Sequence, residues 1–177
     1  MNILKYEGSG LWINICLTNQ KARFYILAMS ERFKPVAGVY LVFKKQNGEI
    51  LLLRRYNTGF GDGQYSMVSG HIDGGESFQQ AAIREGREEA GVAIKMNGLK
   101  VLYVLHRMNK AQNYEAINVF IQVKNWNGEI QNTEPEKCDD LSWFDPNNLP
   151  ENVLDYVKFA LNEIQKGQTY GEFGWGI

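Results

Sequence analysis

The sequence predicts a single α/β domain, and three features of the 177-residue chain lead to this expectation. The length suits one buried core, since domains usually hold about 100 to 200 residues. Several short runs are rich in β-branched and aromatic residues and are bounded by Gly- and Asn-containing turns, which is typical of strands. Two longer stretches carry the spacing of helices instead. Strands and helices therefore share one core.

The first 34 residues stand apart from this pattern. They hold two apolar runs, LWINICL and ARFYILA, which fit either a hairpin or an irregular extension. We expect an N-terminal extension over residues 1–34, the domain proper over residues 35–167, and a C-terminal tail over residues 168–177. The tail is rich in glycine and aromatic residues. Packing across the domain, a homodimer contact and a role in substrate binding all remain open for it.

Strand signals follow in order from Val36. The run VAGVYLVFKK, the polar turn QNGE and the run ILLLRR predict a β-hairpin. A glycine-rich loop, YNTGFGDGQ, leads into the next run, YSMVSGHI. Later in the chain the runs LKVLYVLH, AINVFIQVK and LSWF predict further strands, and NWNGE predicts a turn.

Two helices complete the predicted domain. Ser77 and Gln80 have the spacing of a capping box, and Gly91 stands where a helix C-cap belongs. The first helix is therefore expected from about Phe78 to Ala90. The second is expected near the end of the domain, where apolar residues at helical spacing predict an amphipathic helix that packs on the sheet. These residues are Val153, Val157, Ala160, Leu161 and Ile164.

The composition excludes several classes of protein. With 19 basic and 20 acidic residues, the chain has no overall field to attract nucleic acid. Its apolar runs are shorter than the roughly 20 residues that cross a bilayer, and its N-terminus makes a poor signal peptide. Cys16 and Cys138 lie far apart, so neither a disulfide framework nor a zinc site is indicated. We expect a protein of the reducing cytoplasm.

The stretch SGHIDGGESFQQAAIREGREEAGV concentrates acidic residues among small ones. On a helix, Glu85, Glu88 and Glu89 share one side, where like charges cost about 0.2 to 0.5 kcal/mol per pair. A solvated charged face is the common explanation for acidic residues on a helix. Here a glycine-rich loop with its own acids leads directly into the helix. Such a cluster suits Mg²⁺ bound together with a phosphorylated substrate.

The same stretch resembles the Nudix box, Gx5Ex7REUxEExGU, in which U is a bulky aliphatic residue. Eight spaced positions over 23 residues match it, which is far more specific than a lone glycine-rich loop. The matching residues are Gly70, Glu76, Arg84, Glu85, Glu88, Glu89, Gly91 and Val92. The resemblance extends over about residues 35–167 and is to the MutT-like branch. It implies the Nudix fold, a mixed β-sheet sandwiched between α-helices.

The resemblance also implies an activity, the hydrolysis of a nucleoside diphosphate linked to another moiety. Water attacks a phosphorus while Mg²⁺ or Mn²⁺ is bound. Glu88 and Glu89 match metal ligands, and Glu85 matches a third ligand or the group that deprotonates water. The backbone carbonyl of Ser69 or Gly70 is expected to supply a further metal ligand.

Other residues of the box match supporting roles. Glu76 and Arg84 match an ion pair that braces the loop against the helix, and Gly70 and Gly91 match the glycines of the box. Gly86 departs from the family pattern, which has a bulky aliphatic residue there. A glycine inside a helix costs about 0.5 to 1 kcal/mol relative to alanine. The change implies either a poorer fit or a closer approach of the helix to the sheet.

Acidic and basic residues outside the box are weaker candidates. Relatives often add an acid from a later loop, and the segment NTEPEK offers Glu134 first and Glu136 next, although surface glutamates are equally expected there. Arg54 and Arg55 end a strand near the mouth of the site and suit phosphate binding. Only one of the two is expected to face inward, because adjacent strand residues point to opposite faces.

Histidine and aromatic side chains remain open. His71 and His106 are more often structural than catalytic, despite the useful pKa of histidine. Among the loop and tail aromatic residues, one is expected to stack on a nucleobase, without a preference among them. These residues are Tyr114, Trp126, Tyr170, Phe173 and Trp175.

The preferred interpretation is a Mg²⁺-dependent hydrolase that converts a nucleoside triphosphate to a monophosphate and pyrophosphate. An ADP-ribose or other nucleoside diphosphate hydrolase comes next, followed by a nucleotide-binding module without turnover. An isopentenyl-diphosphate isomerase shares the fold but needs a cysteine near the metal site, and Cys16 and Cys138 are poorly placed for this in the sequence. A small-molecule nucleotide is the expected partner, with a homodimer possible.

Overall fold

The computed structural model describes residues 33–176, so nearly all of the predicted N-terminal extension lies outside the described residues. The two longer helices are α2 (Phe78–Ala90) and α3 (Asp155–Gln165), with a short 3-10 helix, η1 (Met96–Gly98). The strands are β1 (Val36–Phe43), β2 (Ile50–Arg55), β3 (Tyr65–Ser66), β4 (Val68–His71), β5 (Ala93–Ile94), β6 (Leu99–Asn109), β7 (Tyr114–Val123), β8 (Trp126–Asn127), β9 (Cys138–Phe144) and β10 (Tyr170–Phe173).

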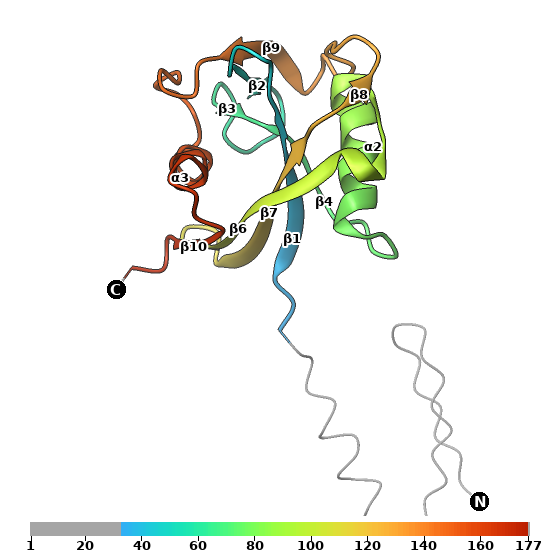
Figure 1. The fold of residues 1–177 in the computed structure, drawn as a ribbon. Coiled ribbons are helices and arrows are strands. Elements are labelled where there is room, and N and C mark those ends of the chain that lie inside the picture. The colour runs from blue at the N-terminus through green and yellow to red at the C-terminus, as the bar shows by residue number, and fades with distance from the viewer. Residues whose placement is uncertain (1–32, 177) are drawn as a thin grey trace, which may run out of the picture. The chain divides into compact units, whose positions relative to one another are not determined.

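A five-stranded sheet in the order β10-β6-β7-β1-β4 forms the centre. It is mixed, because β1 runs parallel to β7 and antiparallel to β4, while β10 runs parallel to β6. A three-stranded sheet, β3-β2-β9, and a two-stranded sheet, β5-β8, complete the strands. Figure 1 shows α2 and α3 on opposite sides of the central sheet. The predicted fold class, a mixed sheet sandwiched between helices, is confirmed.

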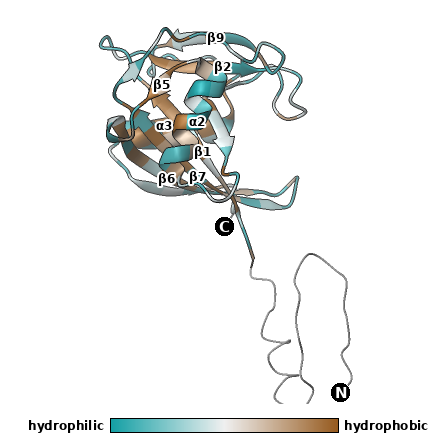
Figure 2. Ribbon diagram, turned by 90° about the vertical axis from the view of Figure 1, so that its right-hand side faces the viewer, coloured by the Kyte–Doolittle hydropathy of each residue, from teal (hydrophilic) through white to brown (hydrophobic). Residues whose placement is uncertain are grey.

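Strand β1 shows why the sequence forms this sandwich. Its side chains alternate between two cores, since successive residues of a strand point to opposite faces. Val39 and Leu41 pack in the core that α2 covers, whereas Tyr40 and Val42 pack in the core that α3 covers. The sequence of a strand that is buried on both faces is a continuous apolar run, and VYLVF is such a run here. In Figure 2 hydrophobic residues lie along the strands behind α2.

The predicted hairpin between residues 36 and 55 is wrong beyond its turn. The turn itself is present, with the Lys45 N–H donating to the Glu49 carbonyl at 2.9 Å. The two strands then separate into different sheets, and only an isolated bridge joins Lys44 to Ile50. Both edges of β1 are already taken by β4 and β7, so β2 pairs instead with β3 and β9.

The C-terminal tail adds a strand to the central sheet. β10 lies beside β6 in parallel register, with Phe173 opposite Arg107. Beyond it, the Trp175 indole N–H donates to the His106 carbonyl at 3.2 Å, and the two rings pack at 4.5 Å. Of the three roles left open for the tail (packing across the domain, a homodimer contact and substrate binding), the structure shows packing across the domain.

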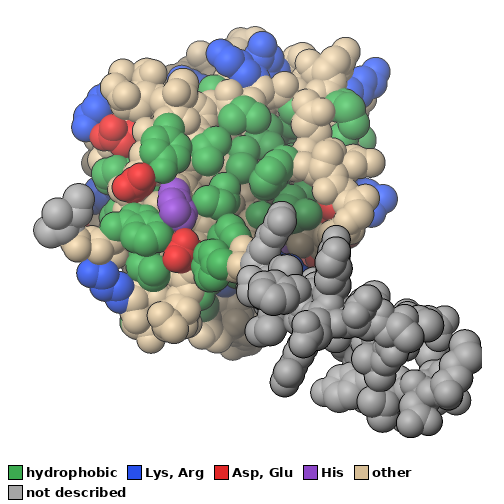
Figure 3. All heavy atoms as spheres, turned by 90° about the horizontal axis from the view of Figure 1, so that it is seen from below, with side chains coloured by type: hydrophobic (Ala, Val, Ile, Leu, Met, Phe, Trp, Pro, Cys, Tyr) green, Lys and Arg blue, Asp and Glu red, His purple; other side chains and the backbone are tan. Residues whose placement is uncertain are grey.

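Some large apolar side chains remain on the surface. Figure 3 shows hydrophobic residues gathered on the face seen from below, around a histidine. Val101 of β6 and Tyr170 of β10 are each about half exposed. The homodimer stays a prediction. Among the described residues, no helix has the length and apolar character needed to cross a membrane.

Gly86 lies on the buried side of α2, against residues of β5 and β1. A Cβ added at this position would lie 2.4 Å from Cδ1 of Ile94 and 3.4 Å from Cδ2 of Leu41. The glycine therefore permits the closer approach of helix to sheet that the sequence left open. The bulky residue of the family pattern has no room here.

We predict that Gly86→Ile lowers the stability of the protein by about 1 to 3 kcal/mol, because it overpacks this contact. Thermal unfolding measures the effect, at roughly 2 to 4 °C for each kcal/mol in a chain of this size. Gln79→Ile, at an exposed position of the same helix, is the matched control. Equal melting temperatures for the two variants would contradict the close packing at Gly86.

Candidate active site

Helix α2 carries the site, and its ends are those expected from the sequence. Ser77 and Gln80 form the reciprocal capping box at its start, and Gly91 ends it with φ 68° in the left-handed region. Its buried side consists of small residues and one carboxylate. These are Ala81, Ala82, Glu85, Gly86 and Ala90. The glutamates of the acidic cluster therefore differ in exposure. Glu85 lies on the buried side of α2, whereas Glu88 faces solvent.

Arg84 ties the loop before α2 to the acidic cluster. Its guanidinium donates to both carboxylate oxygens of Glu76, from Nη2 at 2.8 Å and from Nε at 3.2 Å. It also donates to the His71 carbonyl at 2.9 Å and to the carboxylates of Glu85 and Glu88. Hydrogen bonding to Arg84 lowers the pKa of Glu76. This is the brace that the Nudix resemblance implies.

Glu85 packs directly against the backbone of β4. A Cβ added to Gly70 would lie 1.8 Å from Oε1 of Glu85, so only glycine leaves room for this carboxylate. Glu85 is 7% exposed, and burial raises its pKa although Arg84 opposes the shift. The position of Gly70 in the box is therefore a packing requirement of Glu85.

Glu89 has fewer partners. Its Oε2 accepts a hydrogen bond from the Ser69 N–H at 2.8 Å. Burial raises the pKa of Glu89 to about 8, and the neighbouring charges of Glu85 and Glu134 act in the same direction. The carboxylates thus repel one another in the protein without a cation.

The loop after β8 brings Glu134 to this cluster. The last carbonyls of a helix lack intrahelical partners. Here the Gln131 N–H donates to the Ala90 carbonyl at 3.1 Å, and the Thr133 hydroxyl donates to the Glu88 carbonyl. Glu134 follows at once and accepts a hydrogen bond from Lys137 Nζ at 2.8 Å. Loop and helix are joined through these main-chain contacts.

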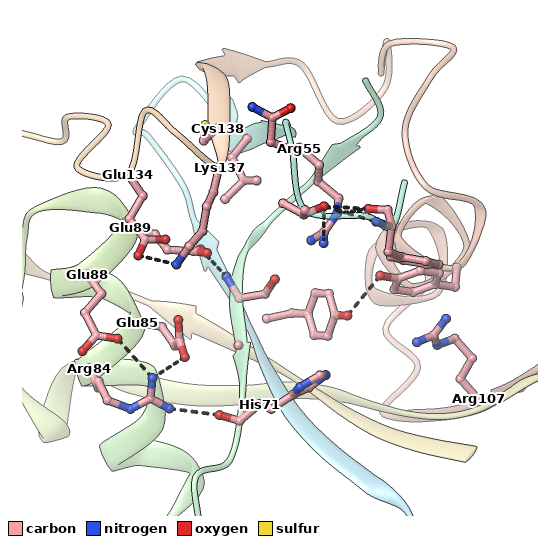
Figure 4. A pocket seen from close by; sticks show the side chains of 18 of the residues that line it. Arg55, His71, Arg84, Glu85, Glu88, Glu89, Arg107, Glu134, Lys137 and Cys138 are labelled. Atoms are coloured by element: carbon pink, nitrogen blue, oxygen red, sulfur yellow. Dashed lines mark hydrogen bonds and ion pairs between the residues drawn. The ribbon is translucent and has the colours of Figure 1, made fainter. Parts of the chain in front are cut away.

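Arg84 and the three glutamates of α2 line one cavity of about 760 Å³. Figure 4 shows Glu85, Glu88 and Glu89 on one side of it and Arg55 and Arg107 on the other. Ser69, Gly70, Glu134 and Lys137 also line it, so the structure brings together the metal-ligand candidates of the sequence. Aromatic side chains complete the wall near the two arginines. They are Tyr40, Phe60, Tyr114 and Tyr156.

The two strand-end arginines are placed differently. Arg55 lines the cavity and donates to the Phe60 carbonyl at 2.6 Å. Arg54 is absent from the cavity wall and pairs with Asp139 at 2.7 Å. The alternation of strand side chains thus separates two residues that the sequence named together.

Other candidates also divide between the cavity and the rest of the molecule. His71 lines the cavity, whereas His106 lies outside its wall, with its Nε2 3.2 Å from a Glu115 carboxylate oxygen. Glu136 is exposed and outside the cavity wall. Of the aromatic candidates, Tyr114 lines the cavity, while Trp126 packs against Phe43 at 5.3 Å.

The prediction that Cys138 is poorly placed to lie near the metal site is wrong. Cys138 lines the cavity, because β9 pairs with β2 and brings its first residue opposite Arg55. Its thiol donates to the Asp140 carbonyl at 3.2 Å. Burial raises the pKa of the thiol, which favours the neutral form over the reactive thiolate.

The sequence analysis did not select Arg107, Tyr156, Phe60 or Lys137 as site residues. A signal for Arg107 was present. In β6 the inward-facing phase includes Tyr103, Leu105 and Arg107, all buried, so an arginine continues an apolar series. Tyr156 belongs to the amphipathic helix α3, where an aromatic residue fits a core position equally well.

The NUDIX domain model matches residues 32–162 of the chain. The chain belongs to the Nudix family. It is 29% identical to the ADP-ribose pyrophosphatase of Methanocaldococcus jannaschii over an aligned region of 124 residues, and this region covers 70% of each protein. It is 30% identical over 143 residues to the oxidized purine nucleoside triphosphate hydrolase of Danio rerio, which covers 75% of this chain and 83% of that one.

A third relative is longer. The chain is 33% identical to the NAD-capped RNA hydrolase of Stutzerimonas stutzeri over 71% of its own length, but it spans less than half of that protein, 43%. Family and relatives together make the chain a Nudix-type pyrophosphohydrolase.

Solved structures agree with this fold. The MutT NUDIX hydrolase from Burkholderia pseudomallei superposes with a TM-score of 0.67 at 25% identity, over 73% of this chain and 98% of that one. A bifunctional NMN adenylyltransferase/ADP ribose pyrophosphatase from Francisella tularensis, complexed with AMP and Mn ion, has a TM-score of 0.59. It shares 17% identity over 83% of this chain and 46% of that one, which shows the fold alone. The MutT-like prediction is confirmed.

Nudix hydrolases generally use a divalent metal, and the residues of this site fit one. Among residues 33–176, no three His, Cys, Asp or Glu side chains converge on a preformed metal cage. Mg²⁺ does not need such a cage, because one or two carboxylates commonly bind it together with substrate phosphates and waters. The solvent-facing Glu88 and the poorly partnered Glu89 supply carboxylates of this kind.

We predict that Gly70→Ala displaces the Glu85 carboxylate and lowers kcat/KM by about a hundred-fold, since misplacement by 1 Å has effects of this size. The fold should persist, because the clash falls on the end of a flexible side chain. Steady-state kinetics with a nucleotide substrate and circular dichroism measure the two effects. Gly98→Ala, in the 3-10 helix η1 and outside the cavity wall, is the control. Unchanged kinetics in Gly70→Ala would contradict the role of this contact.

The raised pKa of Glu89 predicts a pH dependence of stability. In the metal-free protein the folded state keeps the Glu89 proton up to about pH 8, whereas the unfolded chain loses it near 4.5. Stability should therefore fall as the pH rises through this window, because the folded state binds the extra proton.

Glu89→Gln should remove this slope and raise the melting temperature of the metal-free protein above pH 8. It should also abolish the stabilisation that Mn²⁺ gives to the parent protein. Thermal unfolding at pH 6 and pH 8.5, with and without Mn²⁺, checks both. A parent protein whose melting temperature is independent of pH refutes the assignment.

Proposed function

We propose that this protein is a Mg²⁺-dependent hydrolase that converts a nucleoside triphosphate to a nucleoside monophosphate and pyrophosphate. The observation that carries the proposal is the division of charge in one cavity, with four carboxylates on the side of α2 and two arginines opposite. A polyphosphate matches both sides, because a divalent cation joins it to the carboxylates and guanidinium groups bind its oxygens.

Each residue of the site has its own role in the proposed reaction. Glu88 and Glu89 hold the cation, and the Ser69 or Gly70 carbonyl and Glu134 are further ligands. The cation offsets phosphate charge and polarises the phosphorus. Glu85 accepts the proton of the attacking water, since burial raises its pKa toward the working range of a general base. Arg84 and Glu76 keep these carboxylates in place, and Arg55 binds phosphate.

Aromatic side chains line the cavity, but base stacking on such rings tolerates any nucleobase, so they do not identify the base. The name of one similar protein, the oxidized purine nucleoside triphosphate hydrolase of Danio rerio, favours a triphosphate.

The second candidate is an ADP-ribose type of substrate, which the similarity to the Methanocaldococcus jannaschii ADP-ribose pyrophosphatase favours. Hydrolysis of such a substrate would use the same carboxylates and the same cation, so only the reaction products distinguish the two candidate functions. The third interpretation of the sequence, a nucleotide-binding module without turnover, is disfavoured by the relatives, which are named as a pyrophosphatase and a hydrolase. Any turnover that depends on Glu88 eliminates it.

We predict that the purified protein releases monophosphate and pyrophosphate from at least one triphosphate in the presence of Mg²⁺. Chromatography of the products from a panel of nucleoside triphosphates, oxidised purine triphosphates and ADP-ribose measures this. Glu88→Gln should lower kcat/KM by at least about a hundred-fold, since metal charge stabilisation is worth several kcal/mol. Glu151→Gln, at an exposed site after β9, should leave the rate unchanged. Cleavage of ADP-ribose alone would replace the proposed substrate.

A further inference from the structure

Arg107 lies on the cavity wall that faces the carboxylates. It comes from β6 and is only 5% exposed. Its guanidinium lies over the Tyr156 ring at 4.0 Å and beside the Tyr114 ring at 5.2 Å. Nε donates to Oδ1 of Asn118 at 3.3 Å, and Nη2 donates to the Tyr114 hydroxyl. All of these partners are neutral.

The cations of this cavity fall into two groups. Arg84 and Lys137 form ion pairs with carboxylates of the acidic wall. Arg55 and Arg107 form none within 4 Å in the part of the chain that the structure describes. Burying a charge is costly unless it is paired and hydrogen-bonded, and aromatic faces offset only part of this cost. Among residues 33–176, Arg107 is thus a buried cation without a counter-ion.

Arg107 also marks the junction of two hollows. Together with Phe60 and Tyr156 it lines a second, smaller cavity of about 340 Å³ next to the first. A group bound at Arg107 therefore lies across the main cavity from the carboxylates, toward this second hollow (Figure 4). The metal-ligand candidates lie on the other side of the cavity, so this position is separate from the phosphates that a cation there would hold.

We propose that Arg107, supported by Arg55, binds the terminal phosphate of the substrate and makes the enzyme select triphosphates over diphosphates. The proposal rests on the proposed function and names the residue that sets its substrate class. A guanidinium binds phosphate oxygens with a planar fork of donors, and phosphate brings the negative charge that this site lacks. The keto oxygens of a nucleobase are neutral and do not offset a buried charge.

The first experiment uses inorganic probes, which carry no base or sugar. Calorimetry in excess Mg²⁺ compares the binding of tripolyphosphate with that of pyrophosphate. The parent protein should bind tripolyphosphate more tightly. Arg107→Met should lose about ten-fold or more in tripolyphosphate affinity, as expected for a charge-assisted hydrogen bond, and little in pyrophosphate affinity. Lys100→Met removes a charge from the exposed part of the same strand and should change neither.

Arg107→Lys keeps the charge but not the fork, and it serves if the methionine variant does not fold. It should bind tripolyphosphate more weakly than the parent protein, with pyrophosphate binding retained. Equal affinities of this variant and the parent protein for tripolyphosphate would overturn the proposal. So would an equal loss for both probes in a folded Arg107→Met protein.

The second experiment measures kcat/KM for triphosphates and diphosphates with two different bases. The ratio of triphosphate to diphosphate should fall about ten-fold in Arg107→Met for each base, in line with the binding data. A loss that depends on the base, with tripolyphosphate binding unchanged, would show a base contact and overturn the proposal. If the parent protein cleaves ADP-ribose but no triphosphate, the proposed function fails, while the tripolyphosphate binding still decides whether Arg107 is an anion site.

Discussion

The arrangement of the site depends on one guanidinium. Arg84 leaves the middle of α2 and binds Glu76 and the His71 carbonyl, so the loop after β4 is fastened to the helix. The same group reaches the Glu85 and Glu88 carboxylates and offsets part of their mutual repulsion. Because Gly70 has no side chain, the Glu85 carboxylate has room to lie against the strand. A helix that carries three glutamates thus becomes a surface with fixed carboxylate positions.

The cavity as a whole is matched to a ligand that carries many negative charges. Its acidic side brings four carboxylates together, and burial with the charges of Glu85 and Glu134 raises the pKa of Glu89. Its opposite side holds two guanidinium groups without carboxylate partners among the described residues. Under the proposed function, a polyphosphate bound with a divalent cation would satisfy both sides at once, which would link substrate binding to metal binding.

The sequence predicts the features that short-range interactions determine. Helix α2 begins and ends as expected because its capping box and its C-cap glycine act within a few residues of each end. Pairing between distant strands is less accessible, and this explains the error over the hairpin of β1 and β2 and the misplaced Cys138. Arg107 escaped selection for a related reason, since its burial depends on packing against Tyr156 of α3 and Tyr114 of β7. The box motif identifies the glutamates of α2, and the strand-end position identifies Arg55, whereas Arg107 joins the cavity wall through packing that no motif marks.

The measurement that tests this account most directly is Mn²⁺ binding, followed by electron paramagnetic resonance, in Glu76→Gln and Asp73→Asn. Both variants lose one carboxylate near Arg84, but Asp73 is exposed and 3.7 Å away, whereas Glu76 holds the guanidinium at 2.8 Å. If the brace positions the metal ligands, Glu76→Gln should weaken Mn²⁺ binding by about ten-fold or more, and Asp73→Asn should not. Equal effects in the two variants, or none in Glu76→Gln, would contradict the account.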